Sequence, residues 1–151
     1  MKPLISILSF IILISNITIG QSRCDQMPDS AEIFVIAEQM PEANLTGDQL
    51  AELLNSSIDL TNYRLELIET VYFGVTVNCK GQAFDYEIMR TIDPDLDSKI
   101  IQVIKSNMSW APGKFRGNPV DVRLTERIYI IENRFRILTD KELKKLKKRI
   151  K

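Results

Sequence analysis

Side chains that commonly do chemistry are scarce in this sequence. It contains no histidine, which removes the commonest general base and the commonest metal ligand. Asp93, Asp95 and Asp97 could suggest a cation site, but Asp93 followed by Pro94 is typical of a helix start, where carboxylates cap the helix and favour its dipole. The sequence also lacks a G-x-S-x-G motif, a zinc motif and a cysteine with an evident base. We therefore expect a protein that is not an enzyme and binds no metal or cofactor.

The two cysteines, Cys24 and Cys79, are candidates for a disulfide bond in an exported protein. Such a bond would join the start of the exported chain to the tip of a predicted hairpin. Two independent thiols remain the alternative, because the sequence does not give the distance that decides between them. Acylation of Cys24 is disfavoured, since Arg23 stands where a lipoprotein signal needs a small residue.

An export signal is predicted over residues 1–20. Lys2 provides the only charge of this segment, and Leu4–Ile14 is a short apolar run. Small residues follow the run, so we expect cleavage before Gln21. An uncleaved signal anchor is the alternative, because the apolar segment approaches the length that crosses a bilayer.

Charge is unevenly distributed along a chain whose formal net charge is zero. Residues 23–140 carry 12 basic and 19 acidic side chains, whereas residues 141–151 carry 7 basic side chains and 1 acidic one. An acidic body argues against a nucleic-acid-binding surface, which would need clustered basic residues.

The C-terminal segment is predicted to form a basic amphipathic helix over about 140–150. Thr139 and Glu142 have the spacing of a capping box, and three aliphatic residues lie near one face among lysines. So few apolar residues favour a solvated or partly frayed terminal helix whose apolar residues dock on the domain. Peripheral contact with an anionic membrane surface is the alternative.

The apolar pattern of residues 31–138 predicts a domain of the α+β class, with a small antiparallel sheet and helices packed on one of its faces. Thr46 and Gln49 form a possible capping box for the first helix, and Lys80 with Gly81 supplies a hairpin turn. The predicted elements are an extended run over 31–37, a helix over 47–57, strands over 71–79 and 84–88, a helix over 94–107 and a strand from Val120.

The stretch Trp110–Val120 is predicted to be a structured crossover between the second helix and the last strand. Its two prolines and two glycines can continue neither element. We expect Trp110 to cover the end of the core and Pro119 to fix the backbone where the strand begins. The structural residues of this motif are Trp110, Pro112, Gly113, Gly117 and Pro119.

Several of these motifs, in this order, resemble the C-terminal domain of TonB in the form common in Bacteroidetes. That family has a V-F-x-V-V-E-Q-M-P-E-like opening, a K-D-G hairpin turn, a D-P-x-L-D helix start, and W-x-P-G-K and G-x-P-V motifs. The matching segments here are Ile33–Ile36 with Glu38–Glu42, Lys80–Gly81, Asp93–Asp97, Trp110–Lys114 and Gly117–Val120. The resemblance covers about residues 31–131.

The resemblance implies a protein-interaction domain in the periplasm of a Gram-negative bacterium. Domains of this family bind a short extended segment of an outer-membrane TonB-dependent receptor by strand addition at a sheet edge. Here the edge would be the last strand, around Val122 to Ile130. The implied partner-binding residues are Val122, Arg123, Leu124, Thr125, Arg127 and Tyr129. As an alternative, Arg123 and Arg127 are solvated residues that protect the edge from aggregation.

Family domains also pair through their C-terminal strands, which makes a homodimer a further alternative.

The sequence departs from a full TonB in its organisation. A full TonB carries an N-terminal membrane anchor with a functional histidine and a long Pro-rich spacer, and neither is found in this sequence. A linker over 21–30 spans only tens of ångströms, at about 3.3–3.6 Å per residue. We therefore expect a short exported form, with the domain over 31–138 and a tail over 139–151, that is accessory to outer-membrane transport. A short inner-membrane-anchored energy transducer is the alternative.

Overall fold

The computed structural model describes residues 33–150. The predicted export signal, the predicted linker and Cys24 lie outside the described residues. In chain order the elements are β1 (Glu42–Ala43), α1 (Gly47–Ser57), β2 (Ile68–Val77), β3 (Ala83–Arg90), α2 (Pro94–Asn107), β4 (Trp110–Ala111), β5 (Gly113–Phe115), β6 (Asn118–Val120), β7 (Val122–Ile131), β8 (Arg134–Arg136) and α3 (Asp140–Ile150). The predicted α+β class and the predicted order of the main elements are confirmed.

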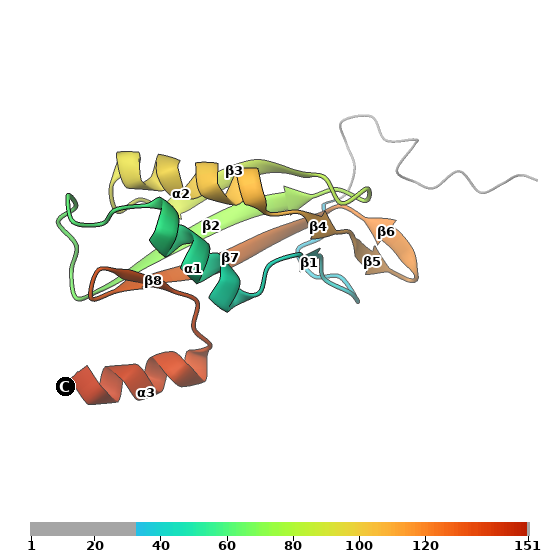
Figure 1. Cartoon of the computed structure of the whole chain (residues 1–151). Coiled ribbons are helices and arrows are strands. Elements are labelled where there is room, and N and C mark those ends of the chain that lie inside the picture. The colour runs from blue at the N-terminus through green and yellow to red at the C-terminus, as the bar shows by residue number, and fades with distance from the viewer. Residues whose placement is uncertain (1–32, 151) are drawn as a thin grey trace, which may run out of the picture.

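The main sheet has the strand order β3-β2-β7-β8, and every neighbouring pair is antiparallel (Figure 1). The two long strands, β2 and β7, pair over all ten of their residues, from Ile68 opposite Ile131 to Val77 opposite Val122. Two short ribbons, β1 with β4 and β5 with β6, lie near the end of the sheet where the β2–β3 hairpin turns (Figure 1). The β2–β7 pair therefore forms the centre of the fold.

The hydrophobic core lies between this sheet and the helices α1 and α2. Both helices cover the same face of the sheet (Figure 1). Alternate residues of β2 and β7 point toward them, as the period of two in the sequence predicts. The fully buried residues of this core include Leu54, Val71, Phe73, Val75, Leu96, Ile100, Ile104, Ile128 and Ile130.

Side-chain caps fix the starts of α1 and α2 as the sequence predicts. The Thr46 hydroxyl accepts a hydrogen bond from the Gln49 N–H (3.3 Å), and the Gln49 side chain accepts one from the Thr46 N–H (2.9 Å). At the start of α2, Asp93 Oδ1 accepts hydrogen bonds from the N–H groups of Asp95 (2.9 Å) and Leu96 (3.1 Å). These bonds satisfy backbone donors that have no partner within the helix.

The turn between β2 and β3 is organised by Asn78. Its Oδ1 accepts hydrogen bonds from the N–H groups of Lys80 and Gln82, each at 2.9 Å. Gly81 has a φ of 79°, which explains why glycine occupies this position. Cys79 lies within the turn, because β2 ends at Val77 rather than at residue 79 as the alternation suggested.

A second tight hairpin joins β7 to β8 and was not predicted. Its two loop residues, Glu132 and Asn133, have φ values of 51° and 57°. Positive φ at both positions is the backbone of a type I′ turn, which usually carries Asn-Gly or Asp-Gly. Glu132 gave no such signal, so the sequence did not reveal β8.

The crossover from Trp110 to Val120 forms three short strands, β4, β5 and β6. Trp110 is half-buried and packs against the core, as expected. Gly117, with a φ of 75°, lies in the turn between β5 and β6, and Pro119 pairs with Lys114. The crossover is therefore ordered by the β5–β6 pair within it and by the pairing of β4 with β1.

The helix α3 lies beyond β8, apart from α1 and α2 (Figure 1). Tyr129 and Ile131 of β7 are only 2% and 1% exposed, although neither belongs to the main core. Leu143 and Leu146 of α3 are half-buried, which agrees with docking over these two residues. The prediction of helices on one face was made for residues 31–138 and agrees with α1 and α2, whereas α3 belongs to the separately predicted tail.

Candidate partner-binding edge

The strand predicted to be the free edge is β7, but the sheet order places it between β2 and β8. The strand β2 pairs with all of it, and β8 covers Tyr129–Ile131 on the other side. At the opposite end of β7, Phe34 forms a parallel bridge with Val122. The prediction of a free edge along the whole strand is therefore wrong, because the sequence indicated neither β8 nor the docking of Phe34.

A shorter part of β7 still has an unpaired side. The Arg123 N–H donates to the Phe34 carbonyl (2.8 Å), and the Phe34 N–H donates to the Asp121 carbonyl (2.9 Å). The backbone groups of Arg123 thus point away from β2. Since direction alternates along a strand, the N–H and C=O of Thr125 and Arg127 point the same way. No strand of the described chain pairs with these two residues on that side.

The pattern of exposure along β7 agrees with this gap. Thr125, Glu126 and Arg127 are all exposed, whereas their neighbours Leu124 and Ile128 are buried. In a strand covered on one face, exposure should alternate from residue to residue. Three consecutive exposed residues are expected where a face and the adjoining edge are both open. We refer to Thr125–Arg127 as the open stretch.

The structure separates the predicted partner-binding residues. Val122 and Leu124 point into the main core, and Tyr129 is buried on the side of α3. None of these three side chains is available to a partner. Of the predicted set, Thr125 and Arg127 are the residues that remain exposed.

The Arg123 side chain makes contacts that link neighbouring strands of the main sheet. Its guanidinium donates hydrogen bonds to the Thr76 hydroxyl (3.1 Å) and the Asp85 carbonyl (2.7 Å), and it forms ion pairs with the carboxylates of Asp85 and Glu87. The group lies over Gly74, where an added Cβ would stand only 2.6 Å from a guanidinium nitrogen. Arg123 therefore connects β7, β2 and β3, and its side chain is only 19% exposed.

Arg127 forms an ion pair with Asp140 at the start of α3, at 2.9 Å. The hydrogen bond to Asp140 raises the pKa of Arg127 above its ordinary range. Both side chains are largely exposed, so the pair contributes little stability. Its effect is positional, because it holds the first turn of α3 next to the open stretch.

A cavity of about 210 Å³ lies beside the open stretch. Glu126 and Arg127 form its β7 side. The remaining walls are mainly apolar and include Pro41, Leu45, Leu50, Phe73, Trp110 and Ile137. The cavity is therefore a pocket between β7, the start of α1 and the end of β8.

Glu126 was not among the predicted site residues. It stands opposite Phe73 in the row of β7 that points toward the main core, between Leu124 and Ile128. Partial burial raises the pKa of the Glu126 carboxyl, and the positive charge of Arg127 opposes that shift. The sequence did contain the signal, because an acidic residue interrupts an otherwise apolar alternating row.

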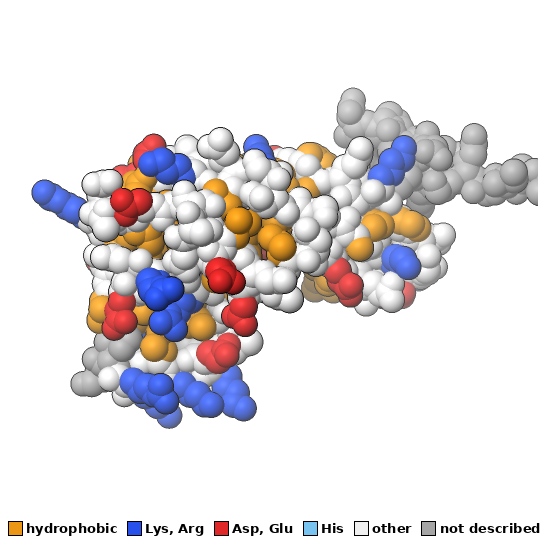
Figure 2. All heavy atoms as spheres, in the orientation of Figure 1, with side chains coloured by type: hydrophobic (Ala, Val, Ile, Leu, Met, Phe, Trp, Pro, Cys, Tyr) orange, Lys and Arg blue, Asp and Glu red, His pale blue; other side chains and the backbone are white. Residues whose placement is uncertain are grey.

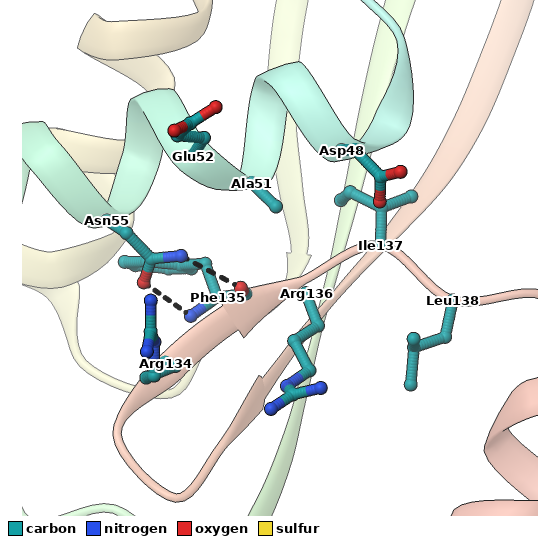
Figure 3. A pocket seen from close by; sticks show the side chains of 9 residues that line it. All are labelled: Asp48, Ala51, Glu52, Asn55, Arg134, Phe135, Arg136, Ile137 and Leu138. Carbon is teal, nitrogen blue, oxygen red and sulfur yellow. Dashed lines mark hydrogen bonds between the residues drawn. The ribbon is translucent and has the colours of Figure 1, made fainter.

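The outer side of β8 is closed by α1. Asn55 donates a hydrogen bond to the Phe135 carbonyl (3.0 Å) and accepts one from the Phe135 N–H (2.9 Å), as Figure 3 shows. The open groove between α1 and β8, of about 420 Å³, is bordered by Arg134 and Arg136. This edge offers no unpaired backbone at Phe135 to a further strand.

The other edge of the sheet, β3, is irregular. Asp85 has a φ of 54°, and the register of β3 against β2 shifts at two places. Such bulges disturb the regular spacing that strand addition needs. Exposed Phe84 and Met89 lie on this strand, but its backbone is a poorer template than the open stretch of β7.

The three carboxylates at the start of α2 have different surroundings. Asp93 caps the helix, and Asp95 forms an ion pair with Lys99 at 2.8 Å. Asp97 is 7% exposed, and its burial raises the pKa of its carboxyl. Within residues 33–150, no group of three Asp, Glu or Cys side chains is placed to hold a metal ion.

Cys79 is held in its turn by a hydrogen bond from its N–H to Asp121 Oδ1, at 2.8 Å. It is not a free thiol. Its predicted partner, Cys24, lies outside the described residues, so the pairing of the two stays a prediction.

The basic residues of α3 gather on its outer side (Figure 2). Thr139 and Glu142 cap this helix as predicted, the Thr139 N–H donating to the Glu142 carboxylate at 2.8 Å. Of the helices in the described part of the chain, none has both the length and the hydrophobicity that a bilayer crossing needs.

No protein-family model, curated protein or solved structure matches this chain.

Proposed function

We propose that this protein is a non-enzymatic interaction module of the cell envelope, which binds an extended segment of a partner protein by strand addition at the open stretch. The observation that carries the proposal is the outward-facing backbone of Thr125 and Arg127 between two paired ends of β7. An added strand would supply partners for these N–H and C=O groups. Affinity would come from the backbone and specificity from alternate side chains.

The site limits how long the added strand is. The Phe34 bridge closes one end of the gap, and the first β8 pair, at Tyr129, closes the other. Leu124–Ile128 lies between them and extends over roughly 17 Å, at about 3.4 Å per residue. The partner segment therefore makes a short strand of about five residues.

The motif resemblance supports the class of partner. In this proposal the domain is TonB C-terminal-like, the protein is exported to the periplasm, and the partner segment belongs to an outer-membrane TonB-dependent receptor. The role is accessory to outer-membrane transport.

The proposal is tested by recovery of partners from outer-membrane extracts of a Bacteroidetes bacterium. Tagged parent protein is compared with Thr125→Pro, which removes an outward-facing N–H while leaving the hydrogen bonds of Leu124 and Glu126 to β2. Thr125→Val is the matched control, because it changes the same side chain and keeps the N–H. Circular dichroism confirms that each variant is folded.

We expect the parent and Thr125→Val to recover an outer-membrane receptor and Thr125→Pro to lose it. Recovery of the same receptor by folded Thr125→Pro would exclude strand addition at this place. Recovery of no receptor by the parent would exclude the proposed partner class.

A further inference from the structure

The carboxylate of Glu126 lies at the open stretch. Within residues 33–150 it forms no hydrogen bond or ion pair, and the charge of the neighbouring Arg127 is the one that acts on it. The nearest positive charge in sequence, Arg127, belongs to the alternate row of β7 and is paired with Asp140. Glu126 therefore presents to the pocket beside β7 a carboxylate on which, within residues 33–150, only the charge of Arg127 acts.

The pocket around this charge is small and mainly apolar. Its volume of about 210 Å³ is below the range typical of drug-sized ligands, and it suits a single long side chain. Leu45, Leu50 and Ile137 supply aliphatic surface, and Trp110 adds an aromatic one. Lys and Arg combine an apolar stem with a charged end, which matches apolar walls beside the Glu126 carboxylate. Arg127 lines the same side of the pocket, but its guanidinium is paired with Asp140.

Strand addition would direct a partner side chain into this pocket. Successive side chains of an added strand point to opposite faces of the sheet. Those on the face of α1 and α2 would stand beside Glu126, because Glu126 belongs to the same face as Phe73 and the core. We propose that the pocket binds a Lys or Arg side chain of the added strand, with Glu126 as the residue that determines this specificity.

This inference rests on the proposed strand addition and names the chemistry of its partner. Other side chains fit the pocket less well. An apolar side chain would cover Glu126 without compensating its charge, and burial of an unpaired carboxylate is costly. An acidic side chain would add repulsion between like charges.

Three pools of synthetic peptides provide the test. Each pool contains nonapeptides of randomised Val, Thr and Ser, and the pools differ only in the central residue, which is Lys, norleucine or Glu. Norleucine has an unbranched aliphatic side chain and no charge, so it separates the effect of the ammonium group from that of the stem. Retention by the immobilised full chain is measured at millimolar peptide, for the parent, Glu126→Gln, Thr125→Val and Thr125→Pro.

We expect the parent and Thr125→Val to retain the Lys pool about tenfold better than the norleucine pool and to reject the Glu pool. Glu126→Gln should retain the Lys and norleucine pools equally, and Thr125→Pro should retain none. Equal retention of Lys and norleucine pools by the parent would overturn the role of Glu126 while leaving strand addition in place. Retention of any pool by folded Thr125→Pro, or of none by the parent, would overturn both proposals.

Discussion

Asn55 hydrogen-bonds both backbone groups of Phe135 with one side-chain amide. A side-chain amide has the same donor and acceptor as a peptide group, so Asn55 takes the place of a neighbouring strand at this residue. Phe135 is 1% exposed, and its backbone would otherwise lack hydrogen-bond partners. This one residue therefore closes an edge that lies one strand away from the open stretch.

We predict that Asn55→Ala lowers the free energy of unfolding by about 1–3 kcal/mol, because it leaves a buried donor and acceptor unsatisfied. Urea denaturation followed by circular dichroism measures the change. Glu52→Ala is the matched control, since Glu52 is exposed on the same helix, and it should change stability by less than about 0.5 kcal/mol. Similar values for the two variants would contradict the role given to Asn55.

At the scale of the element, different parts of β7 make different interactions. Its inward row packs in the core, its first residues pair with Phe34, and its last residues pair with β8. Arg123 adds a side-chain brace that crosses β2 and reaches β3. These interactions hold β7 in place around a stretch whose own edge is unpaired.

The contacts of Arg123 with β2 and β3 also explain why a glycine, Gly74, occupies the middle of β2. We predict that Gly74→Ala lowers the free energy of unfolding by about 1–3 kcal/mol, because the new methyl group displaces the guanidinium of Arg123. In the Arg123→Ala background the same substitution should cost at least about 1 kcal/mol less. A double-mutant cycle by urea denaturation measures this coupling, and equal costs in both backgrounds would show that Gly74 is not needed for the brace.

At the scale of the whole molecule, α3 is joined to the sheet through its first turn. The Arg127–Asp140 ion pair makes this link, and Tyr129 and Ile131, in the same row of β7 as Arg127, are buried. The basic residues of α3 remain on the outside (Figure 2). We expect Leu143 and Leu146, the half-buried residues of α3, to dock the tail on the domain.

We predict that Leu143→Ser combined with Leu146→Ser lowers the free energy of unfolding by about 1–3 kcal/mol, because two half-buried side chains lose apolar contact. Urea denaturation gives the value. Lys144→Ser combined with Lys147→Ser is the control on the exposed side of the same helix, with an expected change of less than about 0.5 kcal/mol. If the two double variants lose equal stability, docking of α3 by its leucines is excluded.

The sequence by itself determined the α+β class, the three helices and the two central strands. These elements carry strong local signals. The capping boxes at Thr46 and Thr139, the Asp93–Pro94 start of α2 and the alternation after Val71 act over a few residues, so they can be recognised without the rest of the chain. The α+β class followed from their order.

The tertiary structure alone decided which part of β7 is open. Whether a strand is an edge depends on pairing with segments distant in sequence, here Phe34 near the start of the described chain and the β8 strand after an atypical turn. The tertiary structure also decided the surroundings of Glu126. The alternation of β7 indicates the face to which Glu126 points, but residues of several separate elements form the pocket beside it. Periodicity specifies the face to which a side chain points, and only packing between distant segments specifies what lies there.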